Sequence, residues 1–171
     1  MVEASAHRVA IALGSNQGDR LAHLRHAVDA IEAGGLLGAI RVSGAYETPP
    51  EKPEDGDPFL NAAVSGDSLM APRQLLDGLL SIESRLGRMR TPGAQGGPRK
   101  IDLDLVLHGA WVLDEPGLHV PHPRFASRAF VLVPLAEIEP DLIEPRSGRR
   151  LHSLLAALAP ASLPRVGSLR K

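Results

Sequence analysis

Short apolar runs and stretches of apolar residues at helical spacing alternate along the first two thirds of the chain. The run HRVAIAL at residues 7–13 is typical of a buried strand, and it ends in the turn GSNQGD. A helical repeat follows up to about residue 33, carried by Leu21, Leu24, Val28 and Ile31. Residues 39–47 and the segment FLNAAVSG, which starts at residue 59, each predict a further strand.

A second helix and a fourth strand complete this pattern. Pro72 stands where a helix tolerates proline best, and the apolar stripe behind it consists of Leu75, Leu79, Ile82 and Leu86. An irregular stretch at 87–98 then precedes an apolar strand at 101–107. The order strand–helix–strand–strand–helix–strand over residues 8–107 predicts an α+β protein, a ferredoxin-like βαββαβ sandwich.

The remaining residues predict additions to this sandwich. The pair at 109–110 can turn the chain into a hairpin that returns through residues 111–113. Helices are expected within VPHPRFASRAFVLVPL and over residues 151–158. No linker divides the chain, so we expect a single domain over residues 1–171. Its core spans about 8–158, and a disordered tail at 159–171 has little to bury.

Composition narrows the classes of partner. Hydrophobic residues make up 43% and charged residues 23% of the 171 residues, which is typical of a globular protein. The formal net charge of −1 argues against a nucleic-acid partner, so an anion site has to come from local arginines. The chain has no cysteine, which excludes disulfides and thiol catalysis. Without a signal peptide or a membrane-spanning run, we expect a cytoplasmic monomer that does not contact a membrane.

Two aspartates interrupt the last predicted strand, in GGPRKIDLDLVLHG. Side chains alternate along a strand, so Asp102 and Asp104 share one face, roughly 7 Å apart. Two carboxylates at that spacing can hold Mg²⁺ against a polyphosphate. Taken alone, the alternation favours an ordinary solvent-facing strand surface, because alternating apolar and charged residues are common.

Arginines gather next to these aspartates. Flexible loops that carry arginine suit a phosphate chain, because guanidinium groups bind phosphate oxygens in pairs. The alternative is a solvated helix end, where arginine also stabilises the helix dipole. Cations beside metal-binding acids favour the phosphate interpretation. The basic residues concerned are Arg85, Arg88, Arg90, Arg99 and Lys100, with Arg124 and Arg128 further along.

A third group of residues suits a flat heterocycle. The segment Thr48-Pro49-Pro50 fixes the backbone direction and leaves carbonyls outside regular pairing. Phe59 and Asn61 share a strand face, which places a ring beside an amide that can donate and accept. Core packing for the phenylalanine and turn capping for the asparagine are the alternative. The turn GSNQGD is by itself a weak anion-binding signal, since it lacks the ending of a P-loop.

Five blocks, in order, carry a family resemblance: GSNQGDR, YETPPEKP, FLNAAV, GPRKIDLDLVLHG and VPHPRFASRAFVLVPLAEIEPDL. Over about residues 8–145 the chain resembles the 6-hydroxymethyl-7,8-dihydropterin pyrophosphokinases of folate biosynthesis. The resemblance implies a ferredoxin-like fold and transfer of the pyrophosphoryl group of ATP to the hydroxymethyl group of the pterin, with release of AMP. ATP and the pterin are then the expected partners.

The resemblance also assigns site residues. It implies that Asp102 and Asp104 hold two Mg²⁺ ions and that Arg99 acts with them in catalysis. For ATP binding it implies Glu83, Arg88, Arg90, Arg99, His122 and Arg128. For the pterin it implies Thr48, Pro49, Pro50, Phe59, Asn61 and Phe130. The pattern departs from the family at Gly96, where an aromatic residue is usual. The competing hypothesis is a non-catalytic ferredoxin-like module that binds a nucleotide as a regulator.

Overall fold

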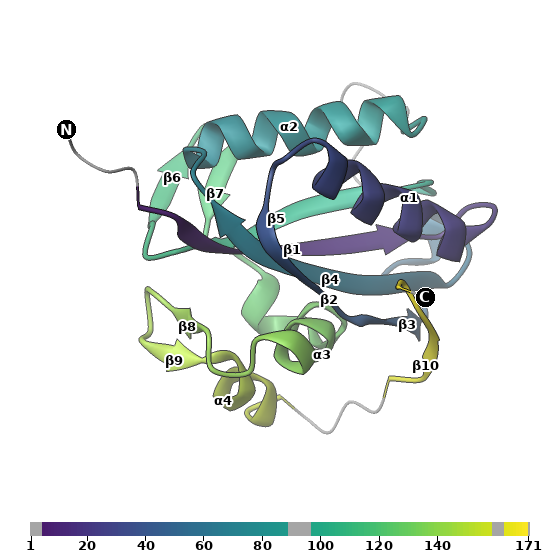
Figure 1. Ribbon diagram of the computed structural model, residues 1–171. Helices are drawn as coiled ribbons and strands as arrows, with labels where there is room; N and C mark the ends of the chain where they lie inside the picture. The colour runs from purple at the N-terminus through teal and green to yellow at the C-terminus, as the bar shows by residue number, and fades with distance from the viewer. Residues whose placement is uncertain (1–4, 89–96, 159–162, 171) are drawn as a thin grey trace.

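The computed structural model describes residues 5–88, 97–158 and 163–170. Its centre is a six-stranded antiparallel sheet, with two helices on one face and two on the other (Figure 1). The α+β prediction is confirmed, because the elements of the βαββαβ unit form in the expected order, with its second strand divided into β2 and β3. The unit comprises β1 (His7–Ser15), α1 (Arg20–Ala33), β2 (Gly38–Val42), β3 (Gly44–Thr48), β4 (Phe59–Ser68), α2 (Pro72–Arg85) and β5 (Asp102–His108).

Shorter elements follow this unit. They are β6 (Leu113–Glu115), β7 (Leu118–Val120), α3 (Ala129–Ile138), β8 (Ile143–Glu144), β9 (Arg149–Arg150), α4 (Leu151–Ala156) and β10 (Arg165–Ser168), with 3-10 turns η1 (Pro53–Asp55) and η2 (Phe125–Ser127). Within the described residues, no helix is long and apolar enough to cross a membrane.

The sheet has the strand order β10-β3-β4-β1-β5, and β2 also pairs with β4. Residues 39–47, which we predicted as one strand, form two strands separated at Ser43. The backbone amide of Ala63 donates to the Ser43 hydroxyl at 2.8 Å, and this hydroxyl donates to the Gly44 carbonyl at 2.7 Å. The buried serine therefore replaces ladder hydrogen bonds where the strand is interrupted.

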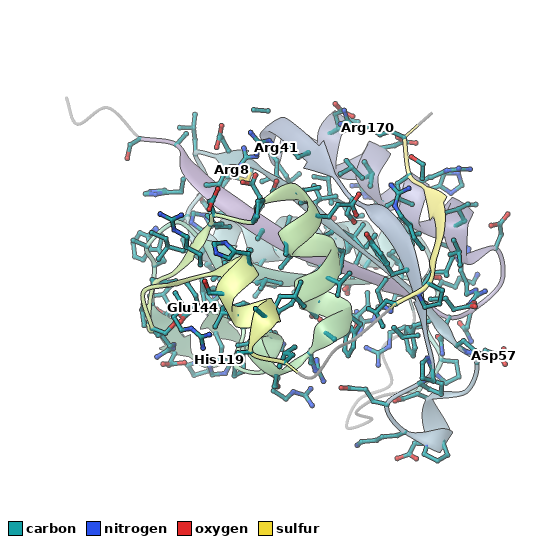
Figure 2. All side chains as sticks on the ribbon, turned by 90° about the horizontal axis from the view of Figure 1, so that it is seen from below. Arg8, Arg41, Asp57, His119, Glu144 and Arg170 are labelled. Carbon is teal, nitrogen blue, oxygen red and sulfur yellow. The ribbon has the colours of Figure 1, made fainter. Side chains whose placement is uncertain are left out.

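The sheet is buried on both faces. Leucine, isoleucine and valine of β1 pack against α1 and α2, whereas its alanines Ala10 and Ala12 face α3 and α4. Glu139, which follows α3, ties this second layer to the sheet. It accepts from the Nε of Arg8 at 2.7 Å and from Arg41 at 3.3 Å, and Figure 2 shows these two arginines side by side.

Two sequence predictions beyond residue 107 need correction. The added hairpin exists, but it joins β6 to β7 and does not fold 111–113 back onto β5. The predicted tail is not disordered over residues 163–170, because β10 pairs with the open edge of β3. Leu169 then enters the core that α1 and α2 share with the sheet, and Arg25 donates to the Ser168 carbonyl at 2.8 Å. Burial of Leu169 and pairing with the free backbone groups of β3 order this segment.

Candidate active site

Several segments that are distant in sequence meet around one cavity of about 300 Å³. Its floor is one end of the sheet on the α3 face, where β1 ends beside the first residues of β4 and β5. Most of the predicted site residues line it: Thr48, Pro49, Phe59, Asn61, Arg88, Arg99, Asp102, Asp104, His122, Arg128 and Phe130. Pro50 and Glu83 do not line it, and Arg90 and Gly96 lie outside the described residues.

Gly14 leaves space at this end of the sheet, because it has no side chain on the cavity face. In the strand register Gly14 lies opposite Asn61 on β4 and opposite Asp102 on β5. The amide and the carboxylate therefore stand two strands apart, roughly 10 Å at the usual strand spacing. A side chain at residue 14 would touch the Asn61 amide oxygen and the Phe59 ring, at 3.6 and 3.8 Å from its Cβ. With glycine at this position, the space beside Asn61 and Phe59 stays open.

The two aspartates lie on the cavity face of β5, as the alternation predicts. Leu103 and Leu105 are buried on the opposite face, in the core with α1 and α2. Asp102 accepts hydrogen bonds from both Arg88 and Arg99. For Asp104, by contrast, burial and then the nearby charge of Asp102 raise the pKa to about 7. Asp104 forms no ion pair within the described residues, and the nearby charges of Arg88 and Arg99 offset only part of this rise in pKa.

Glu83 lies beneath the cavity. It is fully buried near the end of α2, where its Oε1 accepts from the Leu103 amide at 2.7 Å and from Arg88 at 2.5 Å. It also lines a second, smaller hollow together with Leu80, Ser84 and Arg88. Glu83 therefore fixes the orientation of the Arg88 guanidinium between two carboxylates, and it pins α2 to β5 at the level of the aspartates.

Two arginines sit over the two cavity phenylalanines. The Arg99 guanidinium lies 5.6 Å from the centre of the Phe59 ring, and that of Arg128 lies 5.3 Å from the Phe130 ring. Arg128 also forms an ion pair with Glu51 at 2.7 Å. Each ring thus carries a cation on one face, at the distance of a cation–π contact. Charge-binding and ring-binding groups are therefore contiguous in this cavity.

The amide and the histidine of the cavity have defined hydrogen-bonding roles. Asn61 is buried and donates from Nδ2 to the Thr48 hydroxyl at 2.7 Å. Burial and the charges of Arg128 and Arg124 lower the pKa of His122. The neutral imidazole can therefore accept at Nδ1 from the Arg124 backbone amide, 3.2 Å away.

Sequence reasoning missed several lining residues. Glu51, Lys52 and Asp55 belong to the proline-rich loop 49–58, whose irregular composition gave no reason to select single side chains. Arg124 was grouped with the basic residues that suit phosphate but was not assigned to the site. Charged residues inside a loop that follows a candidate binding strand are the signal that could have identified them.

Comparisons with known proteins identify the family of this chain. The family model for 7,8-dihydro-6-hydroxymethylpterin-pyrophosphokinase matches residues 10–140. A 2-amino-4-hydroxy-6-hydroxymethyldihydropteridine pyrophosphokinase of Methylorubrum extorquens is 45% identical over 160 residues, 93% of this chain and 98% of that protein. The Pseudomonas aeruginosa protein of the same name is 43% identical over 150 residues, 88% of this chain and 91% of that one.

More distant proteins contain a similar unit within longer chains. The folate synthesis bifunctional protein of Arabidopsis thaliana is 38% identical over 153 residues, which are 90% of this chain and 27% of that protein. The wild-type HPPK-DHPS crystal structure from Plasmodium falciparum has a TM-score of 0.70 at 14% identity. The match covers 89% of this chain and 44% of that one, and it supports the fold. The chain therefore belongs to the 7,8-dihydro-6-hydroxymethylpterin-pyrophosphokinase family and is a pyrophosphokinase.

Proposed function

We propose that the chain transfers the pyrophosphoryl group of ATP to the hydroxymethyl oxygen of 6-hydroxymethyl-7,8-dihydropterin, releasing AMP, in folate biosynthesis. The observation that carries the proposal is one cavity in which paired carboxylates, four arginines, an amide and two rings converge. Family membership supplies the reaction class. The cavity supplies carboxylates and arginines for the nucleotide, and rings and an amide for the pterin.

Asp102 and Asp104 are proposed to hold two Mg²⁺ ions, and the donor set fits this ion. Mg²⁺ binds through one or two carboxylates and completes its shell with water and substrate phosphates. Within the described residues, no group of three or more acidic, histidine or cysteine side chains forms a closed metal cage. Largely buried Asp104, whose pKa burial raises to about 7, has the character of a carboxylate that a cation would stabilise. When bound, Mg²⁺ would supply charge neutralisation along the triphosphate.

The arginines are proposed to bind the nucleotide phosphates. Phosphoryl transfer depends on positioning and on stabilising charge that develops on the leaving oxygen. Arg88 and Arg99 are held on either side of Asp102, so their guanidinium groups are oriented before the substrate arrives. Arg128 and His122 complete the nucleotide side of the cavity.

Phe59, Phe130 and Asn61 are proposed to bind the pterin, with the backbone of residues 48–50 facing its edge. Two rings provide apolar faces for a planar heterocycle, and the buried amide can donate to and accept from its polar edge. Asn61 is already oriented by its hydrogen bond to Thr48. This arrangement excludes water from the reacting hydroxymethyl group when both substrates are bound.

The direct test is AMP release from ATP, Mg²⁺ and 6-hydroxymethyl-7,8-dihydropterin. We expect AMP from the wild type and a loss of at least about 100-fold in kcat for Asp102→Ala, the size typical of removing a preorganised electrostatic group. Asp141→Ala is the matched control, because Asp141 is exposed and pairs only with Arg150 and His152 among the described residues. Release of ADP instead of AMP contradicts the proposal. Nucleotide binding without any turnover favours the regulatory module.

The metal assignment needs a second measurement. Mn²⁺ can replace Mg²⁺ and be counted by electron paramagnetic resonance in the presence of a non-hydrolysable ATP analogue. We expect two ions per wild-type chain and fewer in Asp102→Ala. An unchanged count in that variant refutes the assignment even if turnover is lost.

A further inference from the structure

Asn16, at the turn after β1, is a buried polar side chain that forms three hydrogen bonds to backbone groups. It is 2% exposed, and its Nδ2 donates to the backbone carbonyls of Asp55 at 2.6 Å and Asp57 at 3.2 Å. Its Oδ1 accepts from the backbone amide of Arg99 at 2.7 Å. The Asn16 backbone amide donates in turn to the Arg99 carbonyl at 3.1 Å. One side chain therefore joins loop 49–58 to the backbone of Arg99, just before β5.

The chemistry of the neighbours fixes the orientation of this amide. The carbonyls of Asp55 and Asp57 only accept, so they require the NH₂ end. The Arg99 amide only donates, so it requires the oxygen. No other side chain of this size offers two donors on one side and an acceptor on the other. An aspartate at this position would direct a second oxygen at two carbonyls.

The two loops also touch each other directly. The Asp55 carboxylate, which is 6% exposed, accepts from the backbone amide of Gly97 at 2.8 Å. Asn16, Asp55 and Gly97–Arg99 thus form a closed set of hydrogen bonds on the outer side of the cavity. Figure 2 shows Asp57, on the same loop, at the end of the molecule far from α4.

We infer that Asn16 is a positioning residue that couples the pterin side of the site to the nucleotide side. The inference rests on the proposed function, which assigns Arg99 to the phosphates and the start of loop 49–58 to the pterin. Asn16 binds the backbone of Arg99 and holds loop 49–58 through two carbonyls, so a shift of the Arg99 backbone on nucleotide binding is passed to that loop. Nucleotide binding then favours the loop position that accepts the pterin.

The alternative is that Asn16 only closes a strand-to-helix turn. Arg20 separates these two possibilities, because it holds the same loop without contacting Arg99. Its guanidinium donates to the Pro58 carbonyl at 2.7 Å and pairs with Glu47 at 2.7 Å. Arg20→Ala therefore loosens the base of loop 49–58 while the connection through Asn16 stays intact.

The experiment measures the pterin dissociation constant by calorimetry, with and without Mg²⁺ and a non-hydrolysable ATP analogue. The ratio of the two constants reports coupling, which between linked sites is typically about 5–150-fold. We expect a ratio above about 5 in the wild type and a ratio near 1 in Asn16→Asp. Arg20→Ala is expected to weaken pterin binding in both states and to keep the wild-type ratio.

Two outcomes overturn the inference: a wild-type ratio near 1, or an Asn16→Asp ratio equal to that of the wild type. If Asn16→Asp does not fold, Asp55→Ala decides, since among the described residues the Asp55 carboxylate accepts only from the Gly97 amide. Its ratio is expected to fall by at least about 2-fold, and an unchanged ratio overturns the inference. AMP release by the wild type is measured separately, so failure of the proposed reaction is distinguished from failure of the coupling.

Discussion

Replacing Asp104 by asparagine is expected to stabilise the metal-free protein while abolishing turnover. The folded protein holds the pKa of Asp104 at about 7, against 3.8 for an ordinary aspartate, chiefly because of burial. A shift of about three pH units corresponds to about 4 kcal/mol, since each unit is worth about 1.4 kcal/mol. The carboxylate thus opposes folding once it is ionised.

The direction in which the free energy of unfolding changes with pH follows from proton binding to Asp104. Between pH 4 and 7 the folded protein retains a proton on Asp104 that the unfolded chain has released. The free energy of unfolding therefore decreases across this range as the pH rises, and the full cost is present above pH 7. Below pH 4 both states are protonated and the cost vanishes. Asp104→Asn, which cannot ionise, removes this dependence.

The expected gain at pH 8 is about 2 kcal/mol, half of the upper value, because the buried amide has its own desolvation cost. For a domain of this size that gain raises Tm by about 4–8 °C. The measurement is thermal unfolding with a chelator present, at pH 8 and pH 4. Asp102→Asn is the matched comparison, and it is expected to lower Tm at pH 8 because it leaves Arg88 and Arg99 without their shared carboxylate.

Adding Mg²⁺ with a non-hydrolysable ATP analogue completes the test. The wild type is expected to gain Tm on addition, whereas Asp104→Asn should gain much less. Equal gains in the two proteins refute the proposed metal role of Asp104. A variant that is no more stable than the wild type at pH 8 refutes the reasoning from its burial.

Two further predictions concern neighbouring elements. Glu51→Gln should tighten nucleotide binding by about 1.5–5-fold, because it removes a half-exposed ion pair worth about 0.2–1 kcal/mol that Arg128 must exchange for phosphate. Calorimetry with the ATP analogue measures this, and weaker binding would mean that Glu51 orients Arg128. Leu169→Ala should cost about 2 kcal/mol and lower Tm by about 4–8 °C, because Leu169 fills the core beside β10. Circular dichroism measures this loss, and an unchanged Tm would show that β10 adds no stability.

The sequence predicted the parts of the site that depend on strand alternation. Asp102 and Asp104 share a face with each other, and Phe59 shares one with Asn61, because side chains in a strand repeat every two residues. These pairs line one cavity in the folded chain. The order of strands and helices likewise predicted the βαββαβ unit, which brings β1, β4 and β5 side by side.

Contacts between loops were not predictable in the same way. The Glu51–Arg128 ion pair joins residues 77 positions apart, and no local pattern announces it. Glu83 lies under Arg88 and binds the Leu103 amide, and these contacts with β5 have no local signal in the sequence. Strand β10 has a short, mixed sequence, and only the open edge of β3 and the pocket for Leu169 give it a structure. Such features depend on tertiary contacts, which a single sequence does not display.

The charged side chains of the cavity that lack an ion-pair partner can be compared with the charges of the proposed substrate. Of the lining arginines, Arg88 and Arg99 are paired with Asp102, and Arg128 is paired with Glu51. Among the described lining residues, Asp55 and Asp104 form no ion pair, and neither do the exposed bases Lys52 and Arg124. The proposed substrate complex would bring a cation to Asp104 and phosphate oxygens to the exposed bases. A magnesium complex of a polyphosphate has this distribution of charge, and neither its metal nor its phosphate alone would balance both ends of the cavity.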